Sequence, residues 1–364
     1  MIKLIKPYIS FDEVEKEFKD VFESGWFSKG KYVKAFAEEI KNYTQAKHAF
    51  LTTSATTALS IALKALGVTQ GDEVIVSDFS FPATANVVED LGATPVFADV
   101  SLESFNMLAK DLEQKITPKT KAVIFVDALG NPSGISTIKA ICKEHNIPLI
   151  EDGACAIGSS ENNIKCGAIA DITCFSFHPR KLLTTGEGGA LTCNDDTLAS
   201  FFEVKLNHGA KVENGQFDFV EYGYNYRLSE LQAVMGIKQF QKLDSIVASR
   251  NKIWNEYKKA LEPLGLKAQK IDENVIFNVQ SVVFITPDNT RDELIRFLKQ
   301  KGIESTLGTY ALSATSYYKN RYNSVQKNSK YLQDNTITLP CYDGVDYQKV
   351  IKSIGEFYAS KKDA

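Results

Sequence analysis

The sequence KAVIFVDALGNPSGISTIKAICKEHNIPLIEDGA, residues 121–154, decides the fold. It predicts an apolar strand (121–128), an amphipathic helix (135–145) and a second apolar strand (148–154). Short runs of Val, Ile and Phe that alternate with amphipathic helices are typical of a parallel sheet with helices on both faces. The same alternation extends from about residue 45 to 195, which predicts a large α/β domain.

Downstream of this region the pattern changes. Residues 229–264 predict a long helical stretch that links the large domain to a smaller C-terminal α/β unit. We therefore expect a large cofactor-binding domain over residues 1–240 and a small domain over 241–364. The polar run KVENGQFDFVEYG (211–223) predicts a long loop, and long loops in compact domains often have a functional role.

Composition favours small-molecule chemistry. The chain has a formal net charge of −3 and an isoelectric point near 5.9, without the basic stripe of a nucleic-acid binder. No apolar run is long enough for a signal peptide or a membrane span, so we expect a cytoplasmic protein with no membrane partner. The six cysteines form no C-x-x-C pair and the four histidines have no zinc spacing, which predicts reduced, buried thiols and no metal site.

Pyridoxal phosphate (PLP) needs a set of groups for which the sequence can be searched. They are a lysine for a Schiff base, an acid beside the pyridine nitrogen, an anion cradle and a flat side chain against the ring. Lys181 follows an apolar run and a proline in CFSFHPRKLLTTGEGG, which puts its amine at the end of a strand. Asp152 ends the run IPLIED, at the carboxyl end of a buried parallel strand, where ligands bind in such sheets.

The phosphate cradle is predicted in TTSATTAL (52–59), where Ser54, Ala55 and Thr56 lead into a helix. Backbone N–H groups at a helix N-terminus bind phosphate without a cationic side chain. Phe81, which follows a strand, is the candidate stacking ring. Each feature has an ordinary alternative: a capped helix without a ligand, a core phenylalanine, a surface lysine and an aspartate N-cap. Their coincidence in one α/β domain, without a dinucleotide or P-loop fingerprint, favours PLP.

These motifs resemble the DegT/StrS family of PLP-dependent sugar aminotransferases, which have the aspartate-aminotransferase (type I) fold. The resemblance runs over nearly the whole chain. The motifs in which it is seen are SGWFSKGKYVKAF (24–36), TSATTAL (53–59), GATPVFADV (92–100), LIEDGACAIG (149–158), FSFHPRKLLTTGEGG (175–189) and GYNYRLSELQAVMGIKQFQKLD (223–244).

The resemblance implies a role for each matching residue. Lys181 would form the Schiff base and Asp152 would contact the pyridine nitrogen. The other implied cofactor contacts are made by Ser54, Ala55, Thr56, Phe81, Cys155 and Ser176, and by Asn225 toward the neighbouring subunit. The implied substrate contacts are made by Trp26, Phe27, His178 and Tyr310. A homodimer with shared active sites is part of the same implication.

Three residues depart from the family pattern. Cys155 replaces a common Gln or His, and a cysteine is a weak hydrogen-bond donor toward the PLP hydroxyl. Asp127 stands where His or Asn is common, and Ser313 where His is common. We expect the last two to touch regions that bind substrate.

The resemblance implies a two-stage transamination, from an amino acid such as L-glutamate to the keto group of a sugar nucleotide, for example a 4-keto-6-deoxy sugar. Freed Lys181 would act as the general base. Such an enzyme would serve cell-surface polysaccharide biosynthesis. Two alternatives remain open: an aminotransferase for a small phosphorylated ketose or other non-nucleotide ketone, and a non-catalytic regulator with the PLP fold.

Overall fold

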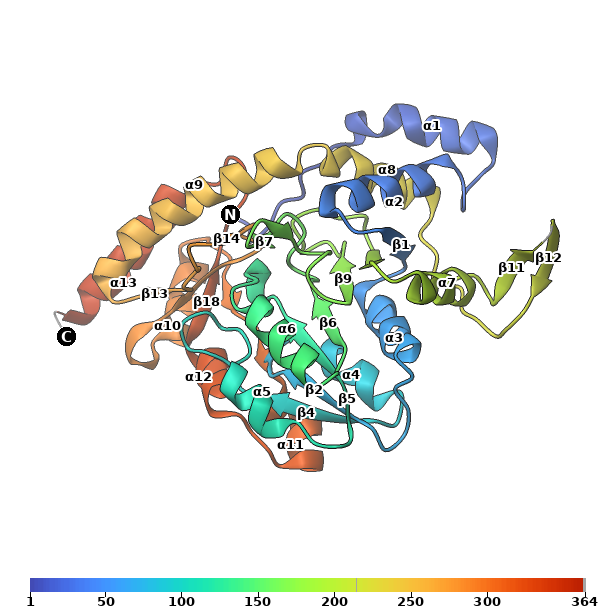
Figure 1. Ribbon diagram of the computed structural model, residues 1–364. Coiled ribbons are helices and arrows are strands. Elements are labelled where there is room, and N and C mark those ends of the chain that lie inside the picture. The colour runs from blue at the N-terminus through green and yellow to red at the C-terminus, as the bar shows by residue number, and fades with distance from the viewer. Residues whose placement is uncertain (214, 363–364) are drawn as a thin grey trace.

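A computed structural model describes residues 1–213 and 215–362, and its centre is a seven-stranded sheet with helices on both faces (Figure 1). β10 runs antiparallel to both neighbours, and the other adjacent strands pair in parallel. The spatial order is β1 (His48–Thr52), β10 (Gly189–Cys193), β9 (Ile172–Ser176), β6 (Leu149–Asp152), β5 (Thr120–Val126), β2 (Glu73–Ser77) and β4 (Thr94–Ala98). The predicted α/β class with a mostly parallel mixed sheet is confirmed.

Alternate residues of the central strands fill two cores, one on each face of the sheet. Ile75 and Val123 pack in the first core, whereas Val74 and Ile124 pack in the second, as the period of two in a strand requires. The first core is covered by α2 (Lys31–Thr44), α5 (Ala109–Lys115), α6 (Ile135–Glu144) and α8 (Glu230–Phe240). The second is covered by α3 (Ala55–Ala65), α4 (Ala83–Glu89) and α7 (Asp196–Lys205).

The C-terminal part has its own sheet and its own core. Its strands, in spatial order, are β13 (Lys267–Ala268), β15 (Val282–Ile285), β18 (Thr336–Leu339) and β16 (Thr306–Leu307). Its helices are α10 (Arg291–Gln300), α11 (Ser316–Tyr322), α12 (Lys327–Asn335) and α13 (Tyr347–Lys362). Figure 1 shows α9 (Leu243–Leu261) running beside α13. The predicted domain boundary between residues 240 and 241 precedes α9 and stays a prediction.

Short strands tie the two parts together. β14 (Val275–Ile276) pairs with β7 (Ser160–Glu161), which also pairs with β8 (Ile164–Lys165). β17 (Tyr310–Ala311) pairs with β3 (Phe79–Ser80). The 3-10 helices are Phe11–Glu13, Ala128–Gly130, Glu262–Leu264, Pro287–Asn289 and Leu312–Ala314.

Two elements differ from the sequence prediction. The run 211–223 is largely a hairpin, β11 (Ala210–Glu213) and β12 (Gln216–Phe219), and Figure 1 shows it projecting from the body near α7. Its apolar side chains face solvent, so its composition resembles that of a loop. The long helix expected over 229–264 is divided at Gln241 and Lys242 into α8 and α9. The break lets α8 pack on α2 while α9 turns toward α13.

Membrane crossing finds no support in the helices. Within residues 1–213 and 215–362, no helix combines the length and the apolar character that a bilayer span needs.

Candidate active site

Most of the candidate residues gather at one edge of the large sheet. In parallel strands the carboxyl ends lie at the same edge, and ligands of α/β proteins bind there. Because β10 is antiparallel, its first residue, Gly189, lies at this edge too, opposite Thr52 and Ser176. The candidates that end or follow the parallel strands are Ser54, Ala55 and Thr56 after β1, Phe81 after β2, Asp152 and Cys155 at β6, and Ser176, His178 and Lys181 at β9.

Lys181 lies half-buried in the connection between β9 and β10. The backbone N–H of Leu182 donates to Gln280 Oε1 (2.6 Å), and that of Thr184 donates to Gln239 Oε1 (3.0 Å). These side chains come from the C-terminal part and from α8, so the connection is fastened from two directions. The lysine therefore stands on a fixed backbone rather than on a free surface loop.

The amine of Lys181 reaches Cys155. Lys181 Nζ donates to Cys155 Sγ at 3.0 Å, and Asn278 Nδ2 holds the Cys155 carbonyl at 2.7 Å. Cys155 is partly exposed, whereas the other five cysteines are buried; all six are free thiols. The structure thus places the unusual Cys155 directly beside the candidate Schiff-base amine.

Asp152 is a buried acid with a defined partner on each oxygen. Its Oδ2 accepts a hydrogen bond from Thr84 Oγ1 (2.7 Å), and its Oδ1 accepts one from the Ala154 N–H (3.3 Å). Burial raises the pKa of Asp152, while the Thr84 hydrogen bond and the Lys181 charge act in the opposite direction. A protonated pyridine nitrogen in front of this carboxyl would add a second cation and favour the ionised acid.

The predicted phosphate cradle is the N-terminus of α3. Ser54 caps the helix: its Oγ accepts from the Thr57 N–H (3.1 Å), and Thr57 Oγ1 accepts from the Ser54 N–H (3.1 Å). The following N–H groups, of Ala55 and Thr56, belong to the first turn, which has no intrahelical acceptor. A Cβ on Gly189 would lie 2.5 Å from the Ser54 carbonyl carbon and 2.7 Å from the Ala55 nitrogen. Glycine is therefore required for β10 to approach the cradle.

Ser176 and His178 frame the approach to the lysine. Ser176 is buried next to Gly189 in register, and its Oγ accepts from the His178 N–H at 3.4 Å. His178 is exposed, and its Nδ1 accepts from the Arg180 N–H at 3.2 Å. Ser176 thus lies beside the cradle, and the His178 ring lies outside it.

Two aromatic rings from distant parts of the chain meet near the edge. Phe81 is 65% exposed and Tyr310 is 40% exposed, and their ring centroids are 6.4 Å apart with an interplanar angle of 62°. An exposed phenylalanine at this edge is not a core residue, so the ordinary alternative for Phe81 is excluded. The open face of the ring is available for stacking.

Trp26, Phe27 and Asn225 are exposed on other segments. The Phe27 carbonyl accepts from the Glu230 N–H (2.9 Å), and Asn225 forms a bridge with Asn207 near the hairpin. Among the described residues, no hydrogen bond or ring contact joins these three candidates to Lys181 or Asp152. Their place in the site therefore stays a prediction.

The two other unusual residues are buried, and the expectation that they touch regions that bind substrate stays a prediction. Asp127 follows β5 and is fully buried, and Ser313 is 1% exposed and bonded to Asp78. Burial, and then repulsion from Glu151, raises the pKa of Asp127 well above its usual range. If both acids were ionised, the Asp127 carboxylate would have no hydrogen-bond partner. When Asp127 is protonated, its carboxyl donates a hydrogen bond to Glu151. Asp127 is therefore the protonated partner of the pair, because like charges at such a buried site do not both ionise.

Cys166 completes a compact group with this pair, since one ligand atom from each of Asp127, Glu151 and Cys166 lies within 4.8 Å of the others. Burial and two neighbouring acids raise the pKa of the Cys166 thiol well above normal.

Sequence reasoning missed Thr84, Gly189 and Gln280. Thr84 stands three residues after Phe81 and Gly189 ends the run GEGG, so both lay next to motifs that had been singled out. Gln280 had no signal, because its contact with the lysine connection joins residues about a hundred positions apart.

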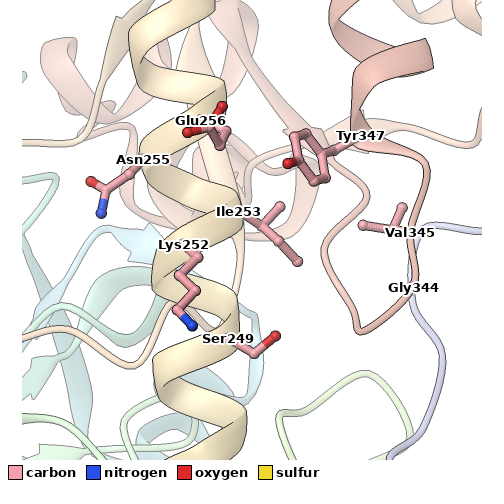
Figure 2. Close-up of a pocket in the computed structure, with 8 residues that line it drawn as sticks. All are labelled: Ser249, Lys252, Ile253, Asn255, Glu256, Gly344, Val345 and Tyr347. Carbon is pink, nitrogen blue, oxygen red and sulfur yellow. The ribbon is translucent and has the colours of Figure 1, made fainter.

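A separate hollow of about 650 Å³ lies between α9 and the start of α13 (Figure 2). None of the candidate residues lines it. Its lining residues are Ser249, Lys252, Ile253, Asn255, Glu256, Gly344, Val345 and Tyr347.

Comparisons with known proteins find aminotransferases over nearly the whole chain. Residues 10–356 match the DegT/DnrJ/EryC1/StrS aminotransferase family. The chain is 36% identical to GDP-perosamine synthase from Vibrio cholerae over 310 residues, 84% of each chain. The aminotransferase TlmJ from Streptoalloteichus hindustanus superposes with a TM-score of 0.92 at 27% identity, covering 100% of both chains. A Streptococcus pneumoniae protein solved in its PLP form superposes with a TM-score of 0.88 at 28% identity, covering 97% of this chain and 98% of that one.

Proposed function

We propose that this chain, which belongs to the DegT/DnrJ/EryC1/StrS aminotransferase family and is a PLP-dependent aminotransferase, aminates the keto group of a nucleotide-linked sugar. One observation supports the proposal above all others: the Lys181 amine, the buried Asp152 carboxyl and the α3 N-terminus meet at one sheet edge. The Vibrio cholerae relative is named for a GDP-linked amino sugar, which supports a sugar-nucleotide acceptor. L-Glutamate is the amino donor that we expect.

The residues fit PLP group by group. When bound, PLP supplies a reactive aldehyde and an electron-accepting ring. Lys181 would hold the aldehyde carbon and Asp152 the ring nitrogen. The α3 N-terminus would hold the phosphate, since its first N–H groups and its positive dipole end favour an anion. Gly189 supports this fit, because a side chain there would fill the cradle.

Each protein group then has a task of its own. Lys181, on its fastened connection, removes the α-proton of the amino donor as general base. Asp152 would stabilise the positive charge on the ring nitrogen. The Thr84 hydroxyl orients one carboxylate oxygen, and the other oxygen accepts only a longer bond from the Ala154 N–H. Phe81, whose side chain is 65% exposed at this edge, would stack against the cofactor ring.

The test is Lys181→Ala, with exposed Lys143→Ala on α6 as the matched control. With L-glutamate and a 4-keto-6-deoxy sugar nucleotide, we expect the mutant to lose amino-sugar formation by about 10⁴-fold, measured by mass spectrometry. The visible cofactor band should also be altered in the mutant and unchanged in the control. An undiminished rate in Lys181→Ala would refute the assignment. A parallel assay with a small phosphorylated ketose decides the acceptor, and exclusive use of that ketone would overturn the sugar-nucleotide proposal.

We also propose a homodimer whose subunits share their active sites. The β11–β12 hairpin exposes Phe217 (61%) and Phe219 (62%), and Trp26 is 66% exposed. Exposed aromatic clusters of this kind mark interaction surfaces. Asn225, next to the hairpin, is exposed and unconnected to the site of its own chain, so a second copy is the natural recipient of its amide. Light scattering of the purified protein should give twice the chain mass, and a monomer would contradict the proposal.

We place the activity in the cytoplasm, as part of cell-surface polysaccharide biosynthesis. Six free cysteines without a disulfide among the described residues support a reducing compartment. Fractionation of cells that express the native chain would test this, and recovery outside the cytoplasm would contradict it.

A further inference from the structure

A ladder of two residue pairs holds Phe81 beside Tyr310. In this ladder, β3 pairs with β17, and Ser80 lies opposite Tyr310. Thr309 Oγ1 adds a hydrogen bond to the Ser80 carbonyl (2.9 Å). A two-stranded ladder this short is not stable by itself. The distance between the two rings therefore depends on whatever fastens the ladder at its end.

A buried aspartate provides that fastening. Asp78 directly precedes β3; its Oδ1 accepts from the Ser313 N–H (2.6 Å) and its Oδ2 accepts from Ser313 Oγ (2.7 Å). The Asp78 carbonyl also accepts from the Leu312 N–H (2.8 Å). Both side chains are buried, so water does not compete for these bonds. Three hydrogen bonds thus join the segments on which Phe81 and Tyr310 lie.

The same strand reaches the acid of the cofactor site. Ser80 Oγ lies 2.8 Å from Thr84 Oγ1, and Thr84 Oγ1 donates to Asp152 Oδ2 at 2.7 Å. A displacement of β3 would therefore move the stacking ring and the hydrogen-bond partner of Asp152 together.

Hydroxyl groups and one like charge surround the Asp78 carboxyl. The groups that face it are Ser313 from the 3-10 helix after β17, Ser329 from α12 and Asp99 from the end of β4. The cation Lys115, on α5, pairs with Asp111 and does not neutralise Asp78. Burial, with a contribution from Asp99, raises the pKa of Asp78 to about 7. Asp78 therefore exchanges its proton close to neutral pH.

We propose that Asp78 and Ser313 are positioning residues that form a proton-sensitive latch, which sets the position of the Phe81–Tyr310 ring pair beside which cofactor and acceptor bind. This role rests on the proposed function of the two aromatic side chains. The ionised carboxylate accepts both bonds from Ser313. The protonated carboxyl instead donates to Ser313 Oγ, so the direction of one bond reverses. Because the pKa is raised in the folded state, the stability contributed by the protonated form is lost as the pH rises toward and through about 7.

Two variants separate the proton from the contact. Asp78→Asn keeps the shape and fixes the hydrogen-bond pattern of the protonated latch, since its amide donates to Ser313 Oγ. Ser313→Ala removes the hydroxyl contact at every pH. Ser353→Ala is the matched control, because Ser353 is a buried serine of α13 whose Oγ bonds only within its own helix. Deuterium uptake of the peptide spanning 309–313 in the cofactor-free chain reports on the latch, and acceptor KM and kcat report on its effect.

For Ser313→Ala we expect faster deuterium uptake at 309–313 and about a tenfold rise in acceptor KM, with kcat changed by no more than about twofold. In the wild type, acceptor KM should change with pH across about pH 6 to 8, and in Asp78→Asn this dependence should disappear. The proposal is overturned if Ser313→Ala matches Ser353→Ala in uptake and KM, or if Asp78→Asn keeps the wild-type pH profile. Deuterium uptake needs no cofactor, so a failure of the proposed function stays distinguishable from a failure of the latch.

Discussion

The carboxyl edge of the large sheet and the β11–β12 hairpin differ in how their side chains are buried and partnered. At the edge, polar groups are buried and most have partners within the chain: Asp152 is bonded to Thr84, and Asp78 to Ser313. On the hairpin, Phe217 and Phe219 are exposed, and among the described residues each has the other as its ring partner. The polar groups at the edge are partnered within the chain, whereas the hairpin rings form the surface that we propose a second copy covers. Substitutions should therefore act on chemistry in the first region and on assembly in the second.

The largest effect is expected from Asp152→Asn. Loss of the carboxylate removes the charge opposite the ring nitrogen, and we expect amino transfer to fall by about 10³-fold. Thr84→Val removes only the bond to Oδ2 and should lower the rate by about tenfold. Steady-state kinetics with L-glutamate measure both changes. Equal losses of rate in the two variants would contradict the expectation that the Asp152 charge contributes more than the Thr84 hydrogen bond.

Assembly should respond to the double substitution Phe217→Ser with Phe219→Ser. Removal of two exposed aromatic side chains from the proposed interface should raise the dimer dissociation constant by about 10²-fold. Sedimentation over a concentration series measures this shift. Tyr331→Ser, an exposed aromatic on α12, serves as the control and should leave the dimer intact. An unchanged dissociation constant in the double variant would show that the hairpin lies outside the interface.

The cradle offers a third test, Gly189→Ala. The new Cβ would meet the backbone of Ser54 and Ala55 at 2.5 and 2.7 Å, so the α3 N-terminus must shift. We expect PLP to bind about tenfold more weakly, as measured by fluorescence titration. Gly355→Ala is the control, because a Cβ at that position meets nothing within 4 Å. Equal PLP affinity in the two variants would show that the approach of β10 does not contribute to phosphate binding.

The smallest effect concerns the buried pair beneath the site. The raised pKa of Asp127 means that its stabilising contribution is present at acid pH and is lost as the pH rises through the folded-state pKa. Asp127→Asn cannot ionise and can still donate to Glu151. We therefore expect its Tm to exceed that of the wild type by about 2–4 °C at alkaline pH and to converge with it at acid pH. A constant difference at all pH values would contradict proton sharing, and exposed Asp12→Asn is the control.

Much of the site could be predicted because it follows the order of the chain. Lys181, Asp152 and Ser54 stand at the ends of apolar strands, and parallel strands bring such ends to one edge. Thr84 and Gln280 could not be predicted, because their contacts depend on packing between distant elements. The burial of Asp127 and Ser313 could not be predicted either, since position in the sequence does not reveal burial.

The hairpin was missed for a related physical reason. Strand prediction relies on an apolar face that turns toward a core, and at β11 and β12 the apolar residues Val212, Phe217 and Phe219 face solvent instead. A strand whose apolar side chains face solvent has a pattern close to that of a polar loop. Such segments are therefore difficult to predict from a single sequence.

The reversed direction of β10 has a consequence for how the site forms. Because β9 and β10 are antiparallel neighbours, residues 177–188 join them directly, without the crossover helix that parallel strands need. A connection of this kind has a smaller loop-closure entropy than a longer crossover. We expect the amine and the cradle strand to come together early in strand pairing, before Gln239 and Gln280 fasten the connection. A longer connection would change the position of Lys181 relative to Gly189 without unfolding the sheet. The length of this connection therefore sets the distance between the amine and the cradle strand.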